Sequence, residues 1–260
     1  MPIGPARMPL FDHIGELRRR LTIVVVSLLA AALVMYFATP VIIDILKDPI
    51  RSYLPNGEFI ITGALNGFSL RFSIAIKVAV VVCTPMIVWQ ILGFFLPALK
   101  PNERKWVVPT ILAMAILFYV GIVFCYFVIV PPAFEFLVGE STAIASVMPE
   151  ASDFIHIETL LMIGFGVAFQ LPLIVFYLAV FHIVPYSTFR SGWRYIYVVM
   201  LVVAASITPD ASPVTMLLMY AVLLLLYEGS LFVTRLVIIR REGKAGLTRG
   251  RVSLFDDEEE

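Results

Sequence analysis

The sequence contains little charge and little cysteine, and both shortages narrow the classes of protein that it can encode. Only 15% of its 260 residues are charged, whereas 60% are hydrophobic. A soluble domain of this length needs far more polar surface, so most of the chain must face lipid or other helices. The two cysteines, Cys83 and Cys125, lie inside apolar runs with no second Cys or His at ligand spacing, which predicts inert helix residues and no metal site.

The apolar runs also lack the motifs of intramembrane enzymes and of nucleotide-driven pumps. They contain no HExxH, no GxSxG, no paired aspartates and no Walker A loop, so we predict neither catalytic residues nor a cofactor. His156 and His182 stand alone at opposite ends of one expected helix, and we expect no nucleic-acid partner. A proton-coupled secondary transporter or channel for a small solute is the alternative class. Against it, the hydropathy shows no internal repeat, and Gln170 is the one polar group clearly at midplane depth.

Long apolar runs predict an all-α membrane protein with six transmembrane helices. The expected spans are residues 21–37, 72–95, 106–130, 154–184, 193–207 and 214–235. These runs are continuous rather than alternating, which excludes the strands of an outer-membrane barrel. A cleavable signal peptide is the rival interpretation of the N-terminus. The run from 21 to 37 is longer than the usual apolar core of such a peptide, so we expect a retained span.

The basic residues are distributed unevenly between alternate loops, which predicts that both termini are cytoplasmic. With the N-terminus inside, fifteen of the nineteen Lys and Arg residues fall on the cytoplasmic side, and only Lys47, Arg51, Arg71 and Lys77 fall outside. Residues 131–153 contain acids but no Lys or Arg. We expect residues 1–240 to form a single transmembrane domain and residues 241–260 to be a disordered cytoplasmic tail.

The last two expected spans are short, and the outer segments are irregular. Residues 193–207 would extend about 22 Å as a helix, against a hydrocarbon core of about 30 Å. Either this hairpin stops short of the outer surface, or the bilayer thins around it, or aromatic and polar flanks complete the span. The segment from 39 to 70 mixes short apolar stretches with prolines and glycines, which predicts turns and short interfacial helices that cap the outer ends.

Two carboxylates, Glu16 and Glu103, occur among the basic residues at the expected cytoplasmic ends of spans. Glu103 suits the first turn of a helix, and Glu16 precedes Arg19 and Arg20 at ordinary ion-pair spacing. Together they have a second interpretation, because two carboxylates on a basic rim can receive a planar guanidinium bidentately, which a lysine cannot match. Phe94 and Leu96 offer apolar surface nearby.

Five stretches resemble the TatC family, the multi-spanning subunit of the twin-arginine (Sec-independent) protein translocase. They are FDHIGELRRRL near the N-terminus, GFFLPALKPNERKWVVP in the first cytoplasmic loop, FYVGIVFCYFVIVPPAFEFL in the third span, FGVAFQLPL in the fourth, and ITPDASP between the last two. They occur in the family's order over residues 9–240. The resemblance implies a glove-shaped, six-helix receptor in a bacterial plasma membrane.

The same resemblance implies partners and site residues. A family member binds the twin-arginine signal peptides of folded cargo and assembles with single-span TatA- and TatB-type subunits, using the proton-motive force. A homo-oligomer within that complex stays open. By position, Glu103 matches the loop glutamate that contacts the arginine pair, Glu16 the glutamate that helps it, and Arg18 the arginine of the same motif. Phe94 and Leu96 complete the expected peptide site.

The chain departs from the family pattern at the expected contacts with a partner helix. Gln170 stands where many members have a glutamate, so a role that needs a titrating carboxylate is in doubt; the alternative is that Gln170 joins helices within the bundle. Thr208 and Asp210 match the family's turn residues, but Pro213 follows where a polar amide is common. Glu228 matches an acid of the sixth helix, and we expect it to snorkel to the inner surface.

Overall fold

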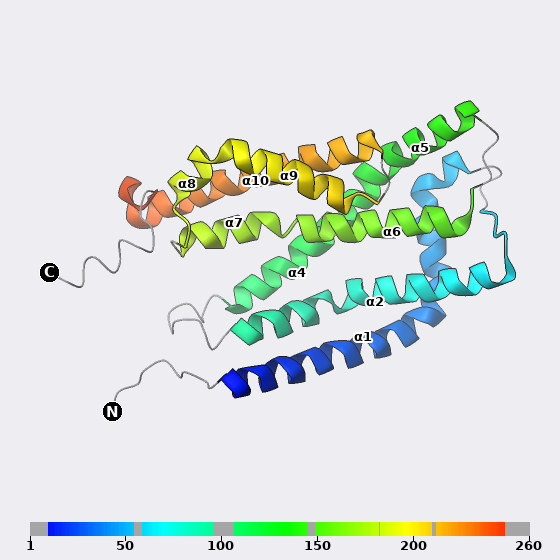
Figure 1. The fold of residues 1–260 in the computed structure, drawn as a ribbon, viewed down its shortest axis with the longest axis horizontal. Coiled ribbons are helices and arrows are strands. Elements are labelled where there is room, and N and C mark those ends of the chain that lie inside the picture. Colours follow the sequence, from blue (N-terminus) through cyan, green and yellow to red (C-terminus); the bar gives the residue numbers. More distant parts are fainter. Residues whose placement is uncertain are drawn as a thin grey trace. The chain divides into compact units, whose positions relative to one another are not determined.

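A computed structural model of the chain describes residues 10–54, 59–95, 107–144, 149–181, 183–209 and 212–247, and this part of the chain is mostly helical (Figure 1). By packing, the chain divides into two compact units. The first unit comprises residues 1–119 and 138–159, and the second comprises residues 120–137 and 160–260. The described ranges contain no strand, and their β pairing is limited to one isolated bridge between Ile60 and Glu150.

The first unit is built on two long antiparallel helices, α1 (Leu10–Lys47) and α2 (Ala64–Phe95). Their contacts show that the two helices are antiparallel, since residues further along α1 contact residues nearer the start of α2. The thiol of Cys83 donates to the carbonyl of Ser27 at 3.9 Å, and Arg71 Nε donates to Thr39 Oγ1 at 3.2 Å. The guanidinium of Arg71 also lies over the ring of Tyr36, 4.9 Å from its centre.

Helix α1 extends beyond the expected span and changes direction near its end. Pro40 lies inside it, and the helix continues to Lys47 before the 3-10 helix η1 (Asp48–Tyr53). Figure 1 shows that this later part runs at a steep angle to the first part. A proline inside a helix removes one hydrogen bond and kinks the axis, which explains the bend. The segment expected to contain turns and short helices is therefore more helical than predicted.

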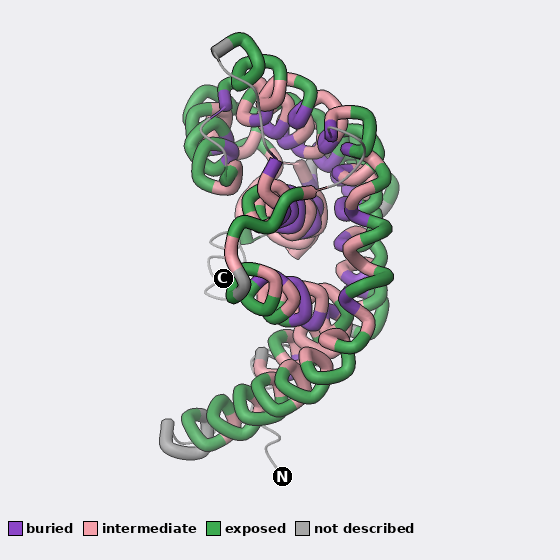
Figure 2. Tube along the Cα trace, turned by 90° about the vertical axis from the view of Figure 1, so that its right-hand side faces the viewer, coloured by how far each residue is buried: buried purple, intermediate pink, exposed green. Residues whose placement is uncertain are grey.

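The apolar surface of α1 is largely uncovered. None of its most hydropathic window is buried, and Figure 2 shows exposed and intermediate residues along the helix that leads from the N-terminus. Leu29, Leu33 and Phe37 are exposed by 67%, 67% and 74%. In water such a stripe would be costly, whereas lipid tails or a partner helix match it. Among the described elements, α1 packs mainly against α2.

The start of α2 is joined to the start of α6 (Ala151–Ala168) by a short backbone bridge. Ile60 N–H donates to the carbonyl of Pro149, and Ala151 N–H donates to the carbonyl of Ile60, both at 3.0 Å. Asn66 Nδ2 donates to Glu150 Oε1 at 2.9 Å, and the rings of Phe59 and Phe154 meet edge to face. These contacts hold α2 and the first turns of α6 side by side.

The expected third span is longer than predicted and contains a π-helical turn. Helix α4 (Val107–Phe124) continues through the π-helical turn η4 (Cys125–Ile129) into α5 (Val130–Ile144). We expected the span to stop at residue 130, before Pro131 and Pro132. The helix continues because the N–H of Val130 reaches back to the carbonyl of Cys125, and this wide turn makes room for the proline rings.

The expected fourth span is two helices rather than one. Helix α6 ends at Ala168, and α7 (Leu171–Val180) begins after a break at Phe169 and Gln170. Pro172 explains the break, because it cannot donate to the carbonyl of Ala168. Within the second unit α6 passes close to α4 at Gly121, where an added Cβ would lie 2.7 Å from the carbonyl oxygen of Phe165. Glycine is required there because any side chain would push the helices apart.

The second unit is completed by α8 (Tyr186–Ser191), α9 (Trp193–Ile207) and α10 (Pro213–Glu242), followed by the 3-10 helix η5 (Lys244–Leu247). Helix α10 packs on α7 and α9. Its buried residues recur every four positions, at Met219, Leu223, Tyr227 and Leu231. That spacing places them on one face. Residues 241 and 242, expected in a disordered tail, belong to α10, and residues 248–260 lie outside the described residues.

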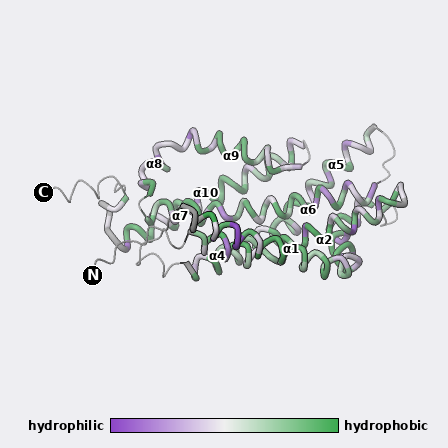
Figure 3. Tube along the Cα trace, turned by 60° about the horizontal axis from the view of Figure 1, so that its bottom comes forward, coloured by the Kyte–Doolittle hydropathy of each residue, from purple (hydrophilic) through white to green (hydrophobic). Residues whose placement is uncertain are grey.

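Five of the described helical segments are long and apolar enough to cross a membrane, and α9 is the shorter apolar one. Figure 3 shows hydrophobic residues along the length of these helices. The bounds predicted for the fifth span, 193–207, coincide with α9. The chain is therefore an all-α, multi-pass membrane protein. The count of six spans and the side on which the termini lie stay predictions.

Candidate functional site

A polar clamp joins the N-terminal part of α1 to the C-terminal part of α2. Arg20 Nε donates to Glu16 Oε1 at 2.7 Å, and Arg20 Nη2 lies 2.7 Å from the same oxygen. Arg20 Nη1 reaches across to α2, where it donates to the carbonyl and to Oε1 of Gln90, both at 3.4 Å. We call these residues, with Gly93, the α1–α2 clamp.

Gly93 lets the arginine lie against α2. An added Cβ at this position would overlap Nη1 of Arg20. A helical glycine costs about 1 kcal/mol relative to alanine, so its presence in the last turn of α2 is explained by this close approach rather than by propensity. The carboxylate of Glu16 is therefore held by Arg20 of the same helix, and Gly93 of α2 leaves the space that the arginine side chain needs.

The residues expected to bind a signal peptide fall partly on this clamp. Glu16 forms the ion pair that its spacing allows, with Arg20 as partner, and its side chain is 32% exposed. Arg18 is exposed, and Phe94 is half-buried at the end of α2. Glu103 and Leu96 lie outside the described residues. The structure brings Glu16 close to the end of α2 that carries Phe94, and the peptide-binding role of these residues stays a prediction.

Gln170 lies at the break between α6 and α7. Its Nε2 donates to the carbonyl of Gly166 at 3.2 Å, and its own carbonyl accepts from the N–H groups of Leu173 and Ile174. This side-chain bond stays within the same chain segment rather than crossing to a neighbouring helix. The side-chain amide of Gln170 thus provides a hydrogen-bond donor for a backbone carbonyl near the place where Pro172 interrupts the helix.

The turn between α9 and α10 contains the other residues expected to contact a partner helix. Thr208 ends α9, and its N–H and hydroxyl both donate to the carbonyl of Ala204 at 3.1 Å. Asp210 lies outside the described residues. Ser212 begins α10 as its N-cap, accepting from the N–H of Thr215 at 3.3 Å. Thr208 and Ser212 are therefore explained locally as helix ends.

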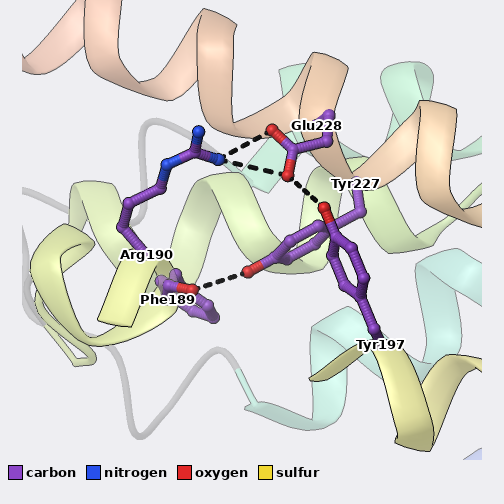
Figure 4. A network of polar contacts seen from close by, with 5 residues as sticks. All are labelled: Phe189, Arg190, Tyr197, Tyr227 and Glu228. Atoms are coloured by element: carbon purple, nitrogen blue, oxygen red, sulfur yellow. Dashed lines mark hydrogen bonds and ion pairs between the residues drawn. The ribbon is translucent and has the colours of Figure 1, made fainter. Parts of the chain in front are cut away.

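Glu228 has partners that its sequence position did not reveal. Arg190 Nη1 donates to both of its carboxylate oxygens, at 3.1 and 2.8 Å, and the hydroxyl of Tyr197 donates to Oε1 at 2.7 Å (Figure 4). The hydroxyl of Tyr227 donates to the carbonyl of Phe189 at 3.0 Å. The hydrogen bond to Glu228 raises the pKa of Arg190. Glu228 joins α8, α9 and α10 rather than only snorkelling.

Two further groups in the first unit were missed or misread from sequence. Lys77, which the sequence placed only among the basic residues of the outer side, contacts His156 and Thr159, so His156 does not stand alone. Glu158 is fully buried on α6, and neither of its carboxylate oxygens has a hydrogen-bond partner among the described residues. A lone acid between apolar residues gives no signal of burial by itself. For Lys77 the sequence did contain a signal, because polar residues recur along α2 at steps of three and four residues and so lie on one face with Lys77.

Comparison with known proteins identifies the family. Residues 12–221 match the family described as Sec-independent protein translocase protein (TatC). The chain is 32% identical over 230 residues to the TatC protein of Carboxydothermus hydrogenoformans, covering 88% of this chain and 94% of that protein. It is 33% identical over 234 residues to that of Deinococcus radiodurans, covering 88% and 87%.

A solved structure agrees with these sequence matches. The crystal structure of a twin-arginine translocase receptor, TatC, aligns with a TM-score of 0.74 at 30% identity. The alignment covers 86% of this chain and 98% of that chain. This chain belongs to the TatC family of Sec-independent protein translocase proteins.

Proposed function

We propose that this chain is the receptor subunit of a twin-arginine translocase, which binds the twin-arginine signal peptides of folded proteins at its cytoplasmic face. Membership of the family, and the likeness to a structure named as the receptor, support this proposal. Such a subunit is a transport component rather than an enzyme. The observation that carries the proposal furthest is the α1–α2 clamp, which holds a carboxylate in a fixed position at the ends of two apolar helices.

Among the residues that the structure describes, the clamp leaves one carboxylate oxygen of Glu16 for a ligand. Both contacts from Arg20 go to Oε1 of Glu16. An incoming guanidinium is therefore offered Oε2, while Arg20 keeps the carboxylate from turning away. Because a guanidinium donates in a flat fork, it can bridge this oxygen and a second carboxylate, such as Glu103 of the following loop. Phe94 and Leu96 then provide apolar surface for the hydrophobic part of the peptide.

The experiment is a binding measurement with a fluorescent signal peptide and the purified full-length protein in nanodiscs. Glu103→Ala and Glu16→Ala are compared with Glu140→Ala, which removes an exposed acid from α5. A charged hydrogen bond is worth about 1.5–3 kcal/mol when partly desolvated and about 0–1 kcal/mol when exposed. We expect a loss of about tenfold or more for Glu103→Ala, a smaller loss for Glu16→Ala, and none for the control.

The same assay with Lys-Lys in place of Arg-Arg tests the chemistry of recognition. The arginine peptide should bind the wild type more tightly, and the two peptides should become similar in Glu103→Ala. Equal binding of both peptides to the wild type would refute the fork-shaped site. Binding that is unchanged in all acid variants would place the peptide elsewhere on the chain.

The proposed receptor works with single-span partners of the TatA and TatB types, and Gln170, Thr208 and Asp210 are the proposed contacts. Gln170 lies at a helix break, where a partner's polar side chain can meet freed backbone groups. A photoreactive residue at 170 should capture a single-span subunit in membranes. Capture of other parts of this chain instead would favour the role within the bundle. An adduct with twice the mass of this chain in the same crosslinking experiment would show that copies of the chain also associate.

We further propose a bacterial plasma membrane with both termini cytoplasmic. The distribution of Lys and Arg supports this orientation, since positive charge is retained on the cytoplasmic side. A reporter that is active only in the cytoplasm, fused after residue 260 and separately after residue 148, should be active at the first site and silent at the second. The reverse pattern would overturn the orientation.

The small-solute transporter is distinguished by a flux assay. The purified chain in liposomes, without partners, should show no uptake above empty liposomes. Export of a folded reporter protein with an Arg-Arg leader should require the chain, and a Lys-Lys leader should reduce that export. Robust solute flux by the chain alone would favour the transporter.

A further inference from the structure

A polar cavity of about 460 Å³ opens between α2 and the beginning of α6, within the first unit. At about 30 Å³ per water molecule, it has room for roughly fifteen waters, so a small charged group fits. Residues of α2 and α6 make up its walls, namely Asn66, Ser69, Leu70, Ser73, Lys77, Ser152, Asp153, His156 and Ile157. On α2 the polar members follow each other at steps of three and four residues, so they form one stripe on an otherwise apolar helix.

The end of this α2–α6 cavity nearest the middle of α2 is cationic. Lys77 Nζ lies 2.9 Å from His156 Nδ1 and donates to Thr159 Oγ1 at 2.9 Å. An ammonium has three N–H donors and no acceptor, so Nδ1 accepts from it and the ring proton sits on Nε2. The third N–H of Lys77 and the Nε2–H of His156 are thus donors for a bound anion, with the hydroxyl of Ser73 one turn away.

The opposite end of the cavity is acidic. Asp153 lies one helical turn before His156 on α6 and is exposed. Beyond it Glu150 accepts from Asn66, and this contact marks the rim of the cavity. The cavity therefore presents donors and a positive charge at its inner end and a carboxylate at its mouth. A ligand with a phosphate and an amine, in that order, matches both ends.

The depth of the cavity agrees with the level of lipid headgroups. The apolar run of α2 continues to Phe95. Lys77 lies about 27 Å from Phe95 along the helix and Asn66 about 44 Å, against a hydrocarbon core of about 30 Å. The cavity thus starts outside the opposite edge of the core and ends within it. An ammonium group at that depth must be paired with polar or charged groups, and a lipid phosphate can provide such a partner.

The cavity also borders the lipid-facing surface. Leu65, Phe68, Phe72 and Ile76 are exposed by 80%, 61%, 53% and 44%. Each of them directly precedes a residue of the polar stripe, so an apolar stripe runs beside the cavity along α2. A lipid can therefore approach from the side, with its headgroup in the cavity and its tails against the helix.

Other ligands fit less well. Lys77 opposes a metal cation, and no group of three or more His, Cys, Asp or Glu side chains that could hold a metal occurs among the residues that the structure describes. A simple anion would use Lys77 and His156 but would be repelled by Asp153. A zwitterion uses both charges of the cavity without repulsion.

We infer that the α2–α6 cavity is a binding site for the zwitterionic headgroup of a phospholipid, with the phosphate at Lys77, His156 and Ser73 and the amine at Asp153. None of these residues belongs to the α1–α2 clamp, so the inference does not depend on signal-peptide binding. A bound lipid would hold the start of α6 against α2 at the membrane surface.

The test is native mass spectrometry of the full-length protein released from nanodiscs that contain equal amounts of phosphatidylethanolamine and phosphatidylglycerol. The two lipids share the phosphate, and only the first has an amine. We expect preferential retention of phosphatidylethanolamine by the wild type. Lys77→Met should weaken its retention about tenfold, as expected for loss of a charged contact, whereas Lys47→Met, a lysine outside the cavity, should not.

Asp153→Asn supplies the sharper arm, because Asp153 is exposed and the exchange preserves shape. It should remove the preference for phosphatidylethanolamine and leave phosphatidylglycerol retained. Soluble phosphoethanolamine at high concentration should displace the lipid from the wild type, and inorganic phosphate should not. Equal retention of both lipids by the wild type, or displacement by phosphate alone, would overturn the inference in favour of non-specific lipid or of a simple anion site. An unaltered preference in Asp153→Asn would also overturn it.

Discussion

The two compact units each contain a carboxylate in contact with an arginine, but they assemble the pair differently. In the first unit Glu16 and Arg20 are four residues apart on one helix, and the arginine then reaches a second helix. In the second unit Glu228 and Arg190 are 38 residues apart, and the pair itself joins α10 to the end of α8. The first pair positions a charge at a helix end, whereas the second ties three helices together.

This difference agrees with the binding role proposed for Glu16 and with a structural role for Glu228. The carboxylate of Glu16 receives Arg20 on one oxygen only, and glycine on the facing helix allows that geometry. The carboxylate of Glu228 receives Arg190 on both oxygens and Tyr197 as well. Glu228 is therefore satisfied within the chain, and Glu16 keeps capacity for an external guanidinium.

The largest expected effect concerns a third acid, which has no arginine. Glu158 is buried with no partner described for either oxygen. Replacing it by leucine removes the cost of burying an unpaired polar group, so Glu158→Leu should raise the free energy of unfolding by about 1–3 kcal/mol. Thermal unfolding in detergent measures this, with Glu158→Gln expected to change it less. A clear loss of stability in Glu158→Leu would show that the acid is paired in the membrane.

The next test breaks the α1–α2 clamp without touching either charge. Gly93→Leu should displace the guanidinium of Arg20 and weaken signal-peptide binding about tenfold, because Glu16 is no longer held. Gly139→Leu is the matched control, since space is open around that helical glycine. Gly139→Leu should raise stability by up to about 1 kcal/mol through helix propensity, whereas in Gly93→Leu that gain is opposed by the lost contacts of Arg20. Undiminished peptide binding in Gly93→Leu would show that the clamp is not part of the site.

A smaller effect is expected from the network around Glu228. Tyr227 is 1% exposed, and its hydroxyl donates to the carbonyl of Phe189. Tyr227→Phe should lower the free energy of unfolding by about 1 kcal/mol, the usual net worth of one hydrogen bond, with peptide binding unchanged. Denaturation of the purified protein measures the first quantity and the binding assay the second. A loss of binding at unchanged stability would give the second unit a direct part in recognition.

The smallest effect is a pH dependence at the rim of the first unit. Hydrogen bonds from Ser152, Thr62 and Asn66 hold the pKa of Glu150 below its ordinary value of 4.5. Since the folded-state pKa is the lower one, the stabilisation is complete above pH 4.5 and is lost as the pH falls through the folded-state value. The protection of the Ile60 and Ala151 amides from hydrogen exchange, relative to their intrinsic exchange rates, should fall over that range, and Glu150→Gln should remove this dependence. Protection that stays constant over the range in the wild type would contradict this.

Much of the fold was predictable because hydropathy and helix length are local properties. The bounds of α9 were found from composition alone, and the ion-pair spacing of Glu16 was read directly. The extension of α1 past Pro40 was not predictable, because proline usually ends a helix, whereas here the helix continues with a kink. The break at Gln170 was missed, although Pro172 marks it two residues later.

The candidate sites were predictable only where their partners are near in sequence. Arg190 and Tyr197 reach Glu228 through the fold, and no spacing rule connects residues so far apart. Lys77 and His156 were treated singly for the same reason. Gly93 was invisible as a functional position, since its part is to leave space for a side chain from another helix. Glu103 was singled out by its place among basic residues, and the family resemblance gave it a role, but it lies outside the described residues.

The π-helical turn at Cys125–Ile129 makes the third long helix adjustable in length. Such a turn holds one residue more than an α-helical turn, and that residue rotates everything after it by about 100° around the axis. Deleting a single residue here would restore regular winding and present a different side of α5 to its surroundings. The chain thus contains a position at which the gain or loss of one residue rotates the following helix without breaking it.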